Sequence, residues 1–233
     1  MDTIISIFTN PVKAFGSLKD REKFPYSVFF ILLALMLINL ILLIPVTEKV
    51  TELAMAKTPL TDEQLDMALQ MTHRLRYLQT AGALVMTAVM YFVYAFVLYI
   101  VQYIAKAGVN YAKILYLTIY SSLVVAVGSL VNTALIYGQG IDGIESPFDI
   151  ARTGLNVFTT VDSAGLVLYA LLSAVTPFEI LFLAALAAGL KAISGSGWLR
   201  SAAISIAYWA VLTGFSLCSA YLSETLMKKS GIF

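Results

Sequence analysis

The stretch YLQTAGALVMTAVMYFVYAFVLYIVQYIA, residues 77–105, contains no charged side chain over 29 consecutive positions. As an α-helix it would be about 44 Å long, and about 20 apolar residues are enough to cross the hydrocarbon core of a bilayer. Backbone amides cannot stay unpaired in hydrocarbon, and the strands of a membrane barrel would alternate in polarity over about 10 residues. The stretch therefore predicts a transmembrane helix that tilts or protrudes.

Four further stretches are uncharged or nearly so: residues 24–47, 114–141, 163–190 with Glu179 as its one charge, and 201–223. Hydrophobic residues make up 60% of the 233 and charged residues only 12%, with a mean hydropathy of +0.85. Soluble domains carry about 25% charged residues. The sequence predicts an all-α integral membrane protein, a bundle of five transmembrane helices with short interfacial helices and a broken or re-entrant segment before span four. The expected spans of this membrane domain, residues 24–233, are about 24–46, 77–105, 113–137, 177–194 and 199–223.

Residues 1–23 form a separate N-terminal segment in which Asn10-Pro11 can start a helix. The spacing of Val12, Phe15 and Leu18 puts apolar side chains on one face of that helix. The segment is expected either to lie in the membrane interface or to cap the base of the bundle. It is not expected to be a cleaved signal, because the apolar run that follows it is about 24 residues long, against 7 to 15 in a signal peptide.

Two boundaries follow from turn and cap residues. Pro45 should end span one near Ile44, because proline removes an amide and restricts the residue before it. Thr61-Asp62-Glu63-Gln64 is the pattern of a capping box, so a helix should start there and run into span two.

In spans four and five, small residues at spacings of four predict close packing of the two helices. On span five they are Ser201 with Ser205 and Ala203 with Ala207.

The fourth apolar stretch is interrupted by Thr176-Pro177-Phe178-Glu179, the spacing of a capping box with proline at the first helical position. Thr176 would accept the amide of Glu179, and the Glu179 carboxylate would return to the amide of Thr176 and meet the positive end of the helix dipole. Span four is therefore expected to begin at Pro177. Residues 163–175 would then form a separate element, either interfacial or re-entrant.

Three sets of polar side chains inside the spans are candidate functional residues. Glu179 is either a helix cap or a proton- or cation-handling carboxylate beside a broken helix. Tyr91 and Tyr94 fall near the middle of span two, where each hydroxyl either bonds a neighbouring helix or lines a substrate path. Asn132 is the amide to satisfy on the small, polar side of span three, which should face protein.

The residue inventory argues against several functions. One histidine, His73, and one cysteine, Cys218, cannot assemble the usual catalytic or metal-binding constellations, so neither an enzyme nor a cofactor is expected. The acidic residues near 142–162 are too dispersed for a calcium loop. No phosphate-binding glycine loop precedes a helix, and a net charge of +1 without a basic block argues against nucleic acid.

The orientation is weakly encoded. With five spans, 8 lysines and arginines fall on the side of the N-terminus and 7 on the other. Those on the first side lie in short loops, which the positive-inside rule weights most. The N-terminus is therefore expected in the cytoplasm and the C-terminus outside the cell.

Four short motifs resemble the Yip (Ypt/Rab-interacting protein) domain family in its prokaryotic form. They are NPVKAF at 10–15, LKDR at 18–21, TPF at 176–178 and AGLKA at 188–192, and the resemblance covers nearly the whole chain. It implies five spans and a cytoplasmic N-terminus. The family usually has aspartate before Pro-Phe, where this chain has Thr176, which can cap equally well. Eukaryotic relatives act in vesicle traffic and bind Rab-type GTPases through long N-terminal regions. With only about 23 residues before span one, GTPase binding is not expected here.

Two functional hypotheses follow. The first is a scaffold of the prokaryotic cell membrane, linked to membrane organisation or trafficking, with the lipid bilayer, further copies of the chain or other membrane proteins as partners. The alternative is a small transporter, channel or lipid-moving protein that uses Glu179 near the broken span four.

Overall fold

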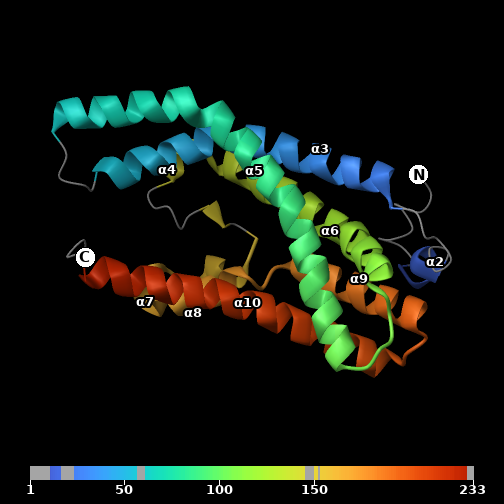
Figure 1. Cartoon of the computed structure of the whole chain (residues 1–233). Helices are drawn as coiled ribbons and strands as arrows, with labels where there is room; N and C mark the ends of the chain where they lie inside the picture. The colour runs from blue at the N-terminus through green and yellow to red at the C-terminus, as the bar shows by residue number, and fades with distance from the viewer. Residues whose placement is uncertain (1–10, 17–23, 57–60, 145–149, 152, 230–233) are drawn as a thin grey trace.

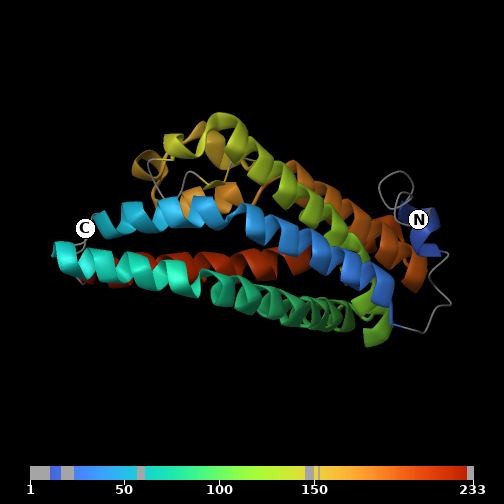
Figure 2. The same cartoon turned by 90° about the horizontal axis from the view of Figure 1, so that it is seen from above.

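The computed structural model describes residues 11–16, 24–56, 61–144, 150–151 and 153–229. These residues form helices and their connections, and none of them is in a strand. Four helices are long and apolar enough to cross a bilayer, and a bent helix pair brings the number to five. The predicted all-α membrane bundle is confirmed, and its long helices run roughly between the two ends of the molecule (Figures 1 and 2).

Helix α6 (Tyr111–Gln139) is the centre of the bundle. It packs against α3 (Tyr26–Leu42), α5 (Asp62–Ile104) and α9 (Pro177–Ser194). Its polar residues Thr118, Ser121, Ser122 and Thr133 are buried, so the prediction that this side of span three faces protein is confirmed. The start of α6 is fixed by a cap that the sequence analysis did not assign: the Asn110 side chain accepts the amide of Lys113 at 3.0 Å.

Span one breaks close to Pro45, and the chain then continues as a second helix. After α3 the chain bends by 45° at Leu43 and continues as α4 (Ile44–Ala56). Pro45 lies in the first turn of α4, where a missing amide costs little because the first amides of a helix have no intrahelical partner. The proline therefore follows a break between two helices, and α3 ends at Leu42, two residues before the expected boundary near Ile44.

Helix α5 runs without interruption over 43 residues, about 65 Å at the usual helical rise. Its predicted capping box is confirmed, since Thr61 Oγ1 accepts the amide of Gln64 and Gln64 Oε1 accepts the amide of Thr61. The polar first part of α5 is tied to α4 by an ion pair between Arg76 and Glu48 at 3.1 Å. The prediction that span two protrudes agrees with this length. The side chain of His73 lies outside the described part of the chain.

Helices α9 and α10 (Trp198–Lys229) pack closely, as predicted, and form an antiparallel hairpin. Gly195 ends α9 in the left-handed conformation with φ +70°, and its amide returns to the carbonyl of Lys191. Ser201 and Ser205 of α10 are buried, as close packing requires, whereas Ala203 and Ala207 are exposed and line a groove between α10 and α5. The expectation that these two alanines also pack on span four is wrong, because they lie on a different side of α10.

Of the predicted N-terminal segment, the structure describes α2 (Pro11–Gly16). Its Phe15 is fully buried, packs against α9 and meets the ring of Tyr120 edge-on at 6.4 Å. A Cβ on Gly189 of α9 would clash with Leu117 Cδ1 of α6 and would approach the Phe15 ring to 3.1 Å, so a glycine is needed where α9 meets α6 and α2. Of the two alternatives for this segment, the described part favours a helix that caps the base of the bundle.

The two ends of the bundle differ in what they contain. Helix α2, the turn between α5 and α6 and the turn between α9 and α10 lie at one end (Figures 1 and 2). Helix α4, the start of α5 and the last turns of α10 lie at the other. Helix α2 and the last turns of α10 thus lie at opposite ends of the molecule, as an odd number of spans between them requires.

Short elements lie between α6 and α9 along the chain. They are η1 (Ile141–Gly143), η3 (Leu155–Phe158), α7 (Val161–Ala164) and α8 (Leu166–Ser173). Helix α8 packs along α10 and against η3. Its 8 residues cover about 12 Å, too short to cross a bilayer. The predicted break before span four is therefore present, as a short helix beside α10.

Candidate functional site

The fourth span begins where the sequence analysis placed it. Thr176 is extended (φ −115°, ψ 157°), its Oγ1 accepts the amide of Glu179 at 2.9 Å, and Pro177 opens the helix. Only this one of the two expected capping-box bonds is formed. The Glu179 carboxylate does not return to the amide of Thr176, so that part of the prediction is wrong. The carboxylate oxygens of Glu179 therefore do not accept the backbone hydrogen bond that was expected of them.

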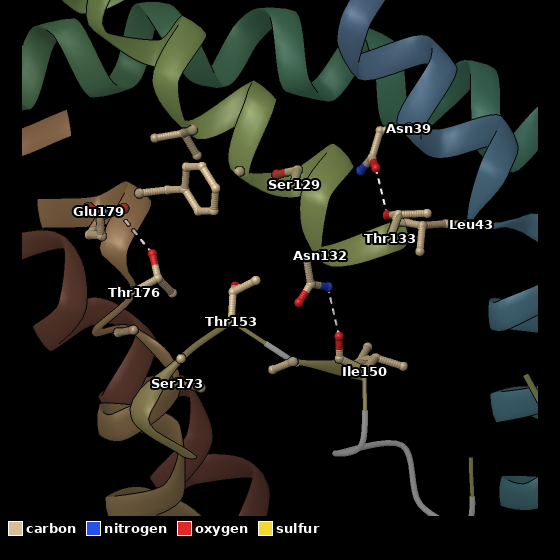
Figure 3. A pocket seen from close by; sticks show the side chains of 16 residues that line it. Asn39, Leu43, Ser129, Asn132, Thr133, Ile150, Thr153, Ser173, Thr176 and Glu179 are labelled. Carbon is tan, nitrogen blue, oxygen red and sulfur yellow. Dashed lines mark hydrogen bonds between the residues drawn. The ribbon is translucent and has the colours of Figure 1, made fainter. Parts of the chain in front are cut away.

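A cavity of about 380 Å³ lies beside this helix start, between α3, α6, α9 and the segment that precedes α9 (Figure 3). Many of the residues that line it are polar: Asn39, Ser129, Asn132, Thr133, Thr153, Ser173, Thr176 and Glu179. Glu179 and Thr176 lie on one side of it, and the side chains from α3 and α6 lie on the other. The break in span four thus brings polar groups of distant segments into one place inside the bundle.

Two hydrogen bonds hold the wall opposite Glu179. Thr133 donates from Oγ1 to Asn39 Oδ1 at 2.7 Å, which joins α6 to α3. Asn132 donates from Nδ2 to the carbonyl of Ile150 at 2.8 Å, which joins α6 to the segment that follows it. Both bonds are drawn in Figure 3. Because each asparagine uses one end of its amide in such a bond, its other end is set in a defined direction.

Phe178 sets how closely α9 approaches α6. A Cβ on Gly128 would lie 2.5 Å from Phe178 Cγ, so the ring occupies space that any larger residue at position 128 would need. Phe178 and Gly128 both line the cavity. The ring therefore forms an apolar wall next to the carboxylate of Glu179.

Glu179 also has tyrosine neighbours outside the cavity lining. Tyr94 of α5 and Tyr208 of α10 lie in its neighbourhood. Tyr91 is buried, and its ring meets those of Phe29 and Tyr94, each at 6.5 Å. The half-buried carboxylate thus lies between the cavity and a group of tyrosines.

The structure brings together four of the seven predicted residues. Thr176, Phe178, Glu179 and Asn132 line one cavity. Pro177 starts α9 and is exposed. Tyr91 and Tyr94 do not line the cavity, and Tyr91 of α5 packs against α3.

Sequence reasoning missed Asn39, Ser129, Thr133, Thr153 and Ser173 as cavity residues. A signal was present for Asn39, which is the one amide side chain in an otherwise apolar α3. The hydroxyl residues of α6 were recognised as a polar face but were assigned to packing alone. Thr153 comes from an irregular segment, and neither composition nor periodicity places such a segment.

The ionisable character of the cavity comes from Glu179. Among the described residues that line the cavity, Glu179 is the one acid, and none is basic. Amide and hydroxyl groups supply further hydrogen-bonding positions around it. The described residues contain no group of three or more histidine, cysteine or acidic side chains placed to hold a metal ion. The arrangement suits a proton or a small positively charged group.

Fold and site together define a polytopic α-helical membrane protein with a polar cavity beside a broken fourth span. The family model of the Yip1 domain matches residues 5–220. The chain belongs to the Yip1 domain family. No match was found among curated proteins, and none among solved structures.

Proposed function

We propose that this Yip1-domain protein is a small transporter that takes a cationic substrate into the cavity at Glu179. One observation carries the proposal: a half-buried carboxylate lines a polar cavity in which no described residue is basic. An ionisable group at membrane depth is costly and is usually kept for function. Transporters commonly place such groups next to interrupted helices, as α8 and α9 are interrupted at Val175-Thr176.

The position of Glu179 along α9 supports this proposal. The 12 residues from Glu179 to Lys191 span about 18 Å of helix. The ammonium of Lys191 lies over the ring of Trp198 at 4.3 Å, a pairing that suits the membrane interface. With a hydrocarbon core about 30 Å thick, Glu179 then falls inside the core rather than at its edge.

Thermal unfolding in lipid nanodiscs tests the binding step. The probes are Na⁺, K⁺, methylammonium, choline and spermidine, each added at constant ionic strength. We expect at least one of them to raise the Tm of the wild type and to leave that of Glu179→Gln unchanged, because the amide keeps the shape but not the charge. The cation that stabilises is then tested for uptake into proteoliposomes, which Glu179→Gln should abolish.

Asp142→Asn is the matched control. It makes the same acid-to-amide change at an exposed residue outside the cavity lining, so it should keep both the shift in Tm and the uptake. A wild type stabilised by none of the five cations would argue against the proposal. So would an equal shift in Glu179→Gln.

A second candidate function is the membrane scaffold, favoured by α5. Leu78, Val85, Met86, Val89 and Phe96 are exposed along this helix. A Cβ on Gly82, which lies within the same stretch, would meet nothing within 4 Å. Small residues on an open helix face let a second transmembrane helix approach closely. A second copy of the chain is the partner we propose for this face.

Self-association in native lipid nanodiscs tests the scaffold. Energy transfer between two labelled copies, with mass spectrometry of what copurifies, should show a dimer that Gly82→Leu weakens. Ala184→Leu, a change at an exposed residue of α9, should leave it intact. A wild type that is monomeric and partnerless under these conditions would remove support for the scaffold.

We also propose that the end of the bundle with α2 faces the cytoplasm of a prokaryotic cell. Lys13, Lys106, Lys113, Lys191 and Arg200 are in α2 or in or next to the two turns at this end. Short basic loops stay on the cytoplasmic side during insertion. Single cysteines introduced in a Cys218→Ser background report which side of the membrane each end faces. A cysteine at position 108 should react with impermeant thiol reagents only after the cell membrane is permeabilised, and a cysteine at position 142 should react in intact cells.

A further inference from the structure

The structure holds a second concave site, separate from the cavity at Glu179. A groove of about 400 Å³ runs between the end of α5 and the beginning of α10. It is lined by Val101, Ile104, Ala105, Arg200, Ala203, Ile204 and Ala207. Six of these seven residues are apolar. Five of those six lie in helices α5 and α10, and Ala105 is the residue that follows α5, so the groove faces the acyl chains of one leaflet.

Arg200 stands at the polar end of this groove. Its Nη2 donates to the carbonyl of Lys106 at 2.8 Å and also to that of Ala105, which closes the C-terminus of α5. A guanidinium has five N–H donors, and these two bonds come from a single nitrogen. The side chain is exposed, so its remaining donors face the headgroup region.

The described charged side chains around the groove are all basic. In the part of the chain that the structure describes, the residues at this end of the bundle include Lys13, Lys106, Lys113, Lys191 and Arg200 and no acid. An apolar groove that ends in a guanidinium and lies under a basic surface matches a molecule with an acyl chain and a phosphate. We propose that this groove binds one anionic phospholipid, with its acyl chain along Ala203 and Ala207 and its phosphate at Arg200.

Ala203 and Ala207 leave room in the groove for the acyl chain of the lipid. They lie one turn apart and are both exposed, whereas Ser201 and Ser205 on another side of α10 are buried. Larger side chains at 203 and 207 would fill the groove without touching the charge of Arg200. This separates the contribution of shape from that of charge.

Trp198 provides an optical probe near the site, because it lies two residues before Arg200 and is half-exposed. In a Trp209→Phe background it is the only tryptophan. The protein is reconstituted in nanodiscs of phosphatidylcholine with increasing fractions of brominated phosphatidylglycerol or brominated phosphatidylcholine, and fluorescence quenching is measured. We expect brominated phosphatidylglycerol to quench at a mole fraction about fivefold lower than brominated phosphatidylcholine. This is the ratio typical of one basic residue near an anionic surface.

Three variants complete the test. Ala203→Leu/Ala207→Leu should remove the fivefold preference by filling the groove, and Arg200→Gln should remove it by removing the charge. Ala184→Leu, on the lipid-facing side of α9, should keep it. Equal quenching by both lipids in the wild type would overturn the proposal. A preference that survives in the groove-filled variant would overturn it too, because the basic surface alone would then account for lipid selection.

Discussion

The ring of Phe178 occupies the space where a side chain on Gly128 would be, with Cγ only 2.5 Å from a Cβ built there. This contact joins the first turn of α9 to the middle of α6. It also fixes the wall of the cavity next to Glu179. The start of the fourth span is therefore held by two independent means, the contact of Phe178 with α6 and the cap of Thr176.

Gly128→Ala should destabilise the protein by about 1 to 3 kcal/mol, the usual cost of inserting a methyl group into a packed interior. Thermal or denaturant unfolding in detergent micelles measures the loss. Gly82→Ala is the control, because nothing lies within 4 Å of its Cβ; it should be neutral or stabilise α5 by up to about 1 kcal/mol. If Gly128→Ala were as stable as the wild type, α6 and α9 would not be packed through Phe178 as described.

Thr176→Ala should cost about 0.5 to 2 kcal/mol, since it leaves the amide of Glu179 without its cap. Thr176→Ser keeps the hydroxyl and should lose much less. Glu179→Gln should leave the stability close to that of the wild type, because its carboxylate does not take part in the capping box. Unfolding curves of the three variants under one condition check this order. A loss in Glu179→Gln as large as that in Thr176→Ala would mean that the carboxylate is structural.

The bond between Thr133 and Asn39 should contribute about 0.6 kcal/mol, the average for hydrogen bonds between transmembrane helices. A double-mutant cycle with Thr133→Val and Asn39→Leu isolates this coupling from the packing changes of each variant. Thr118→Val is a useful reference, because Thr118 bonds within its own helix, to the carbonyl of Ile114. A coupling near zero between positions 133 and 39 would contradict the assigned bond.

Phe15→Ala should release α2 from the bundle, because the ring is fully buried against α9 and Tyr120. A spin label at the exposed position 13 reports the change as faster motion in the electron paramagnetic resonance spectrum. Val12→Ala, at a half-buried residue of the same helix, should have a smaller effect. Equal mobility in all three proteins would show that α2 is held by something other than Phe15.

The sequence was sufficient for the parts of the fold that depend on local chemistry. The bounds of α9 follow from Thr176 and Pro177 at its start and Gly195 after its end. The start of α5 follows in the same way from Thr61 and Gln64. Each of these signals acts within one turn of helix, so a single sequence contains all of it.

The errors concern interactions that local chemistry does not determine. The break near Pro45 was expected, but the helix that follows it was not: in the first turn of α4 the missing amide is harmless, and the chain resumes as helix after Leu43. Ala203 and Ala207 were expected to contact span four, but they line a groove with the end of α5, and spacing alone does not tell which helix a given side of α10 faces. The cavity itself needed the distant partners Asn39 and Ile150, whose proximity to α6 is a property of the tertiary structure.

The burial of Phe15 under Gly189 has a consequence for biosynthesis. Helix α2 is among the first segments to leave the ribosome, and α9, its main contact, is among the last. Until α9 has been inserted, the ring of Phe15 cannot pack against the bundle. It must stay in the membrane interface or bound to a chaperone. A nascent chain truncated before residue 177 should therefore keep α2 sensitive to protease, and completion of the α9–α10 hairpin should protect it.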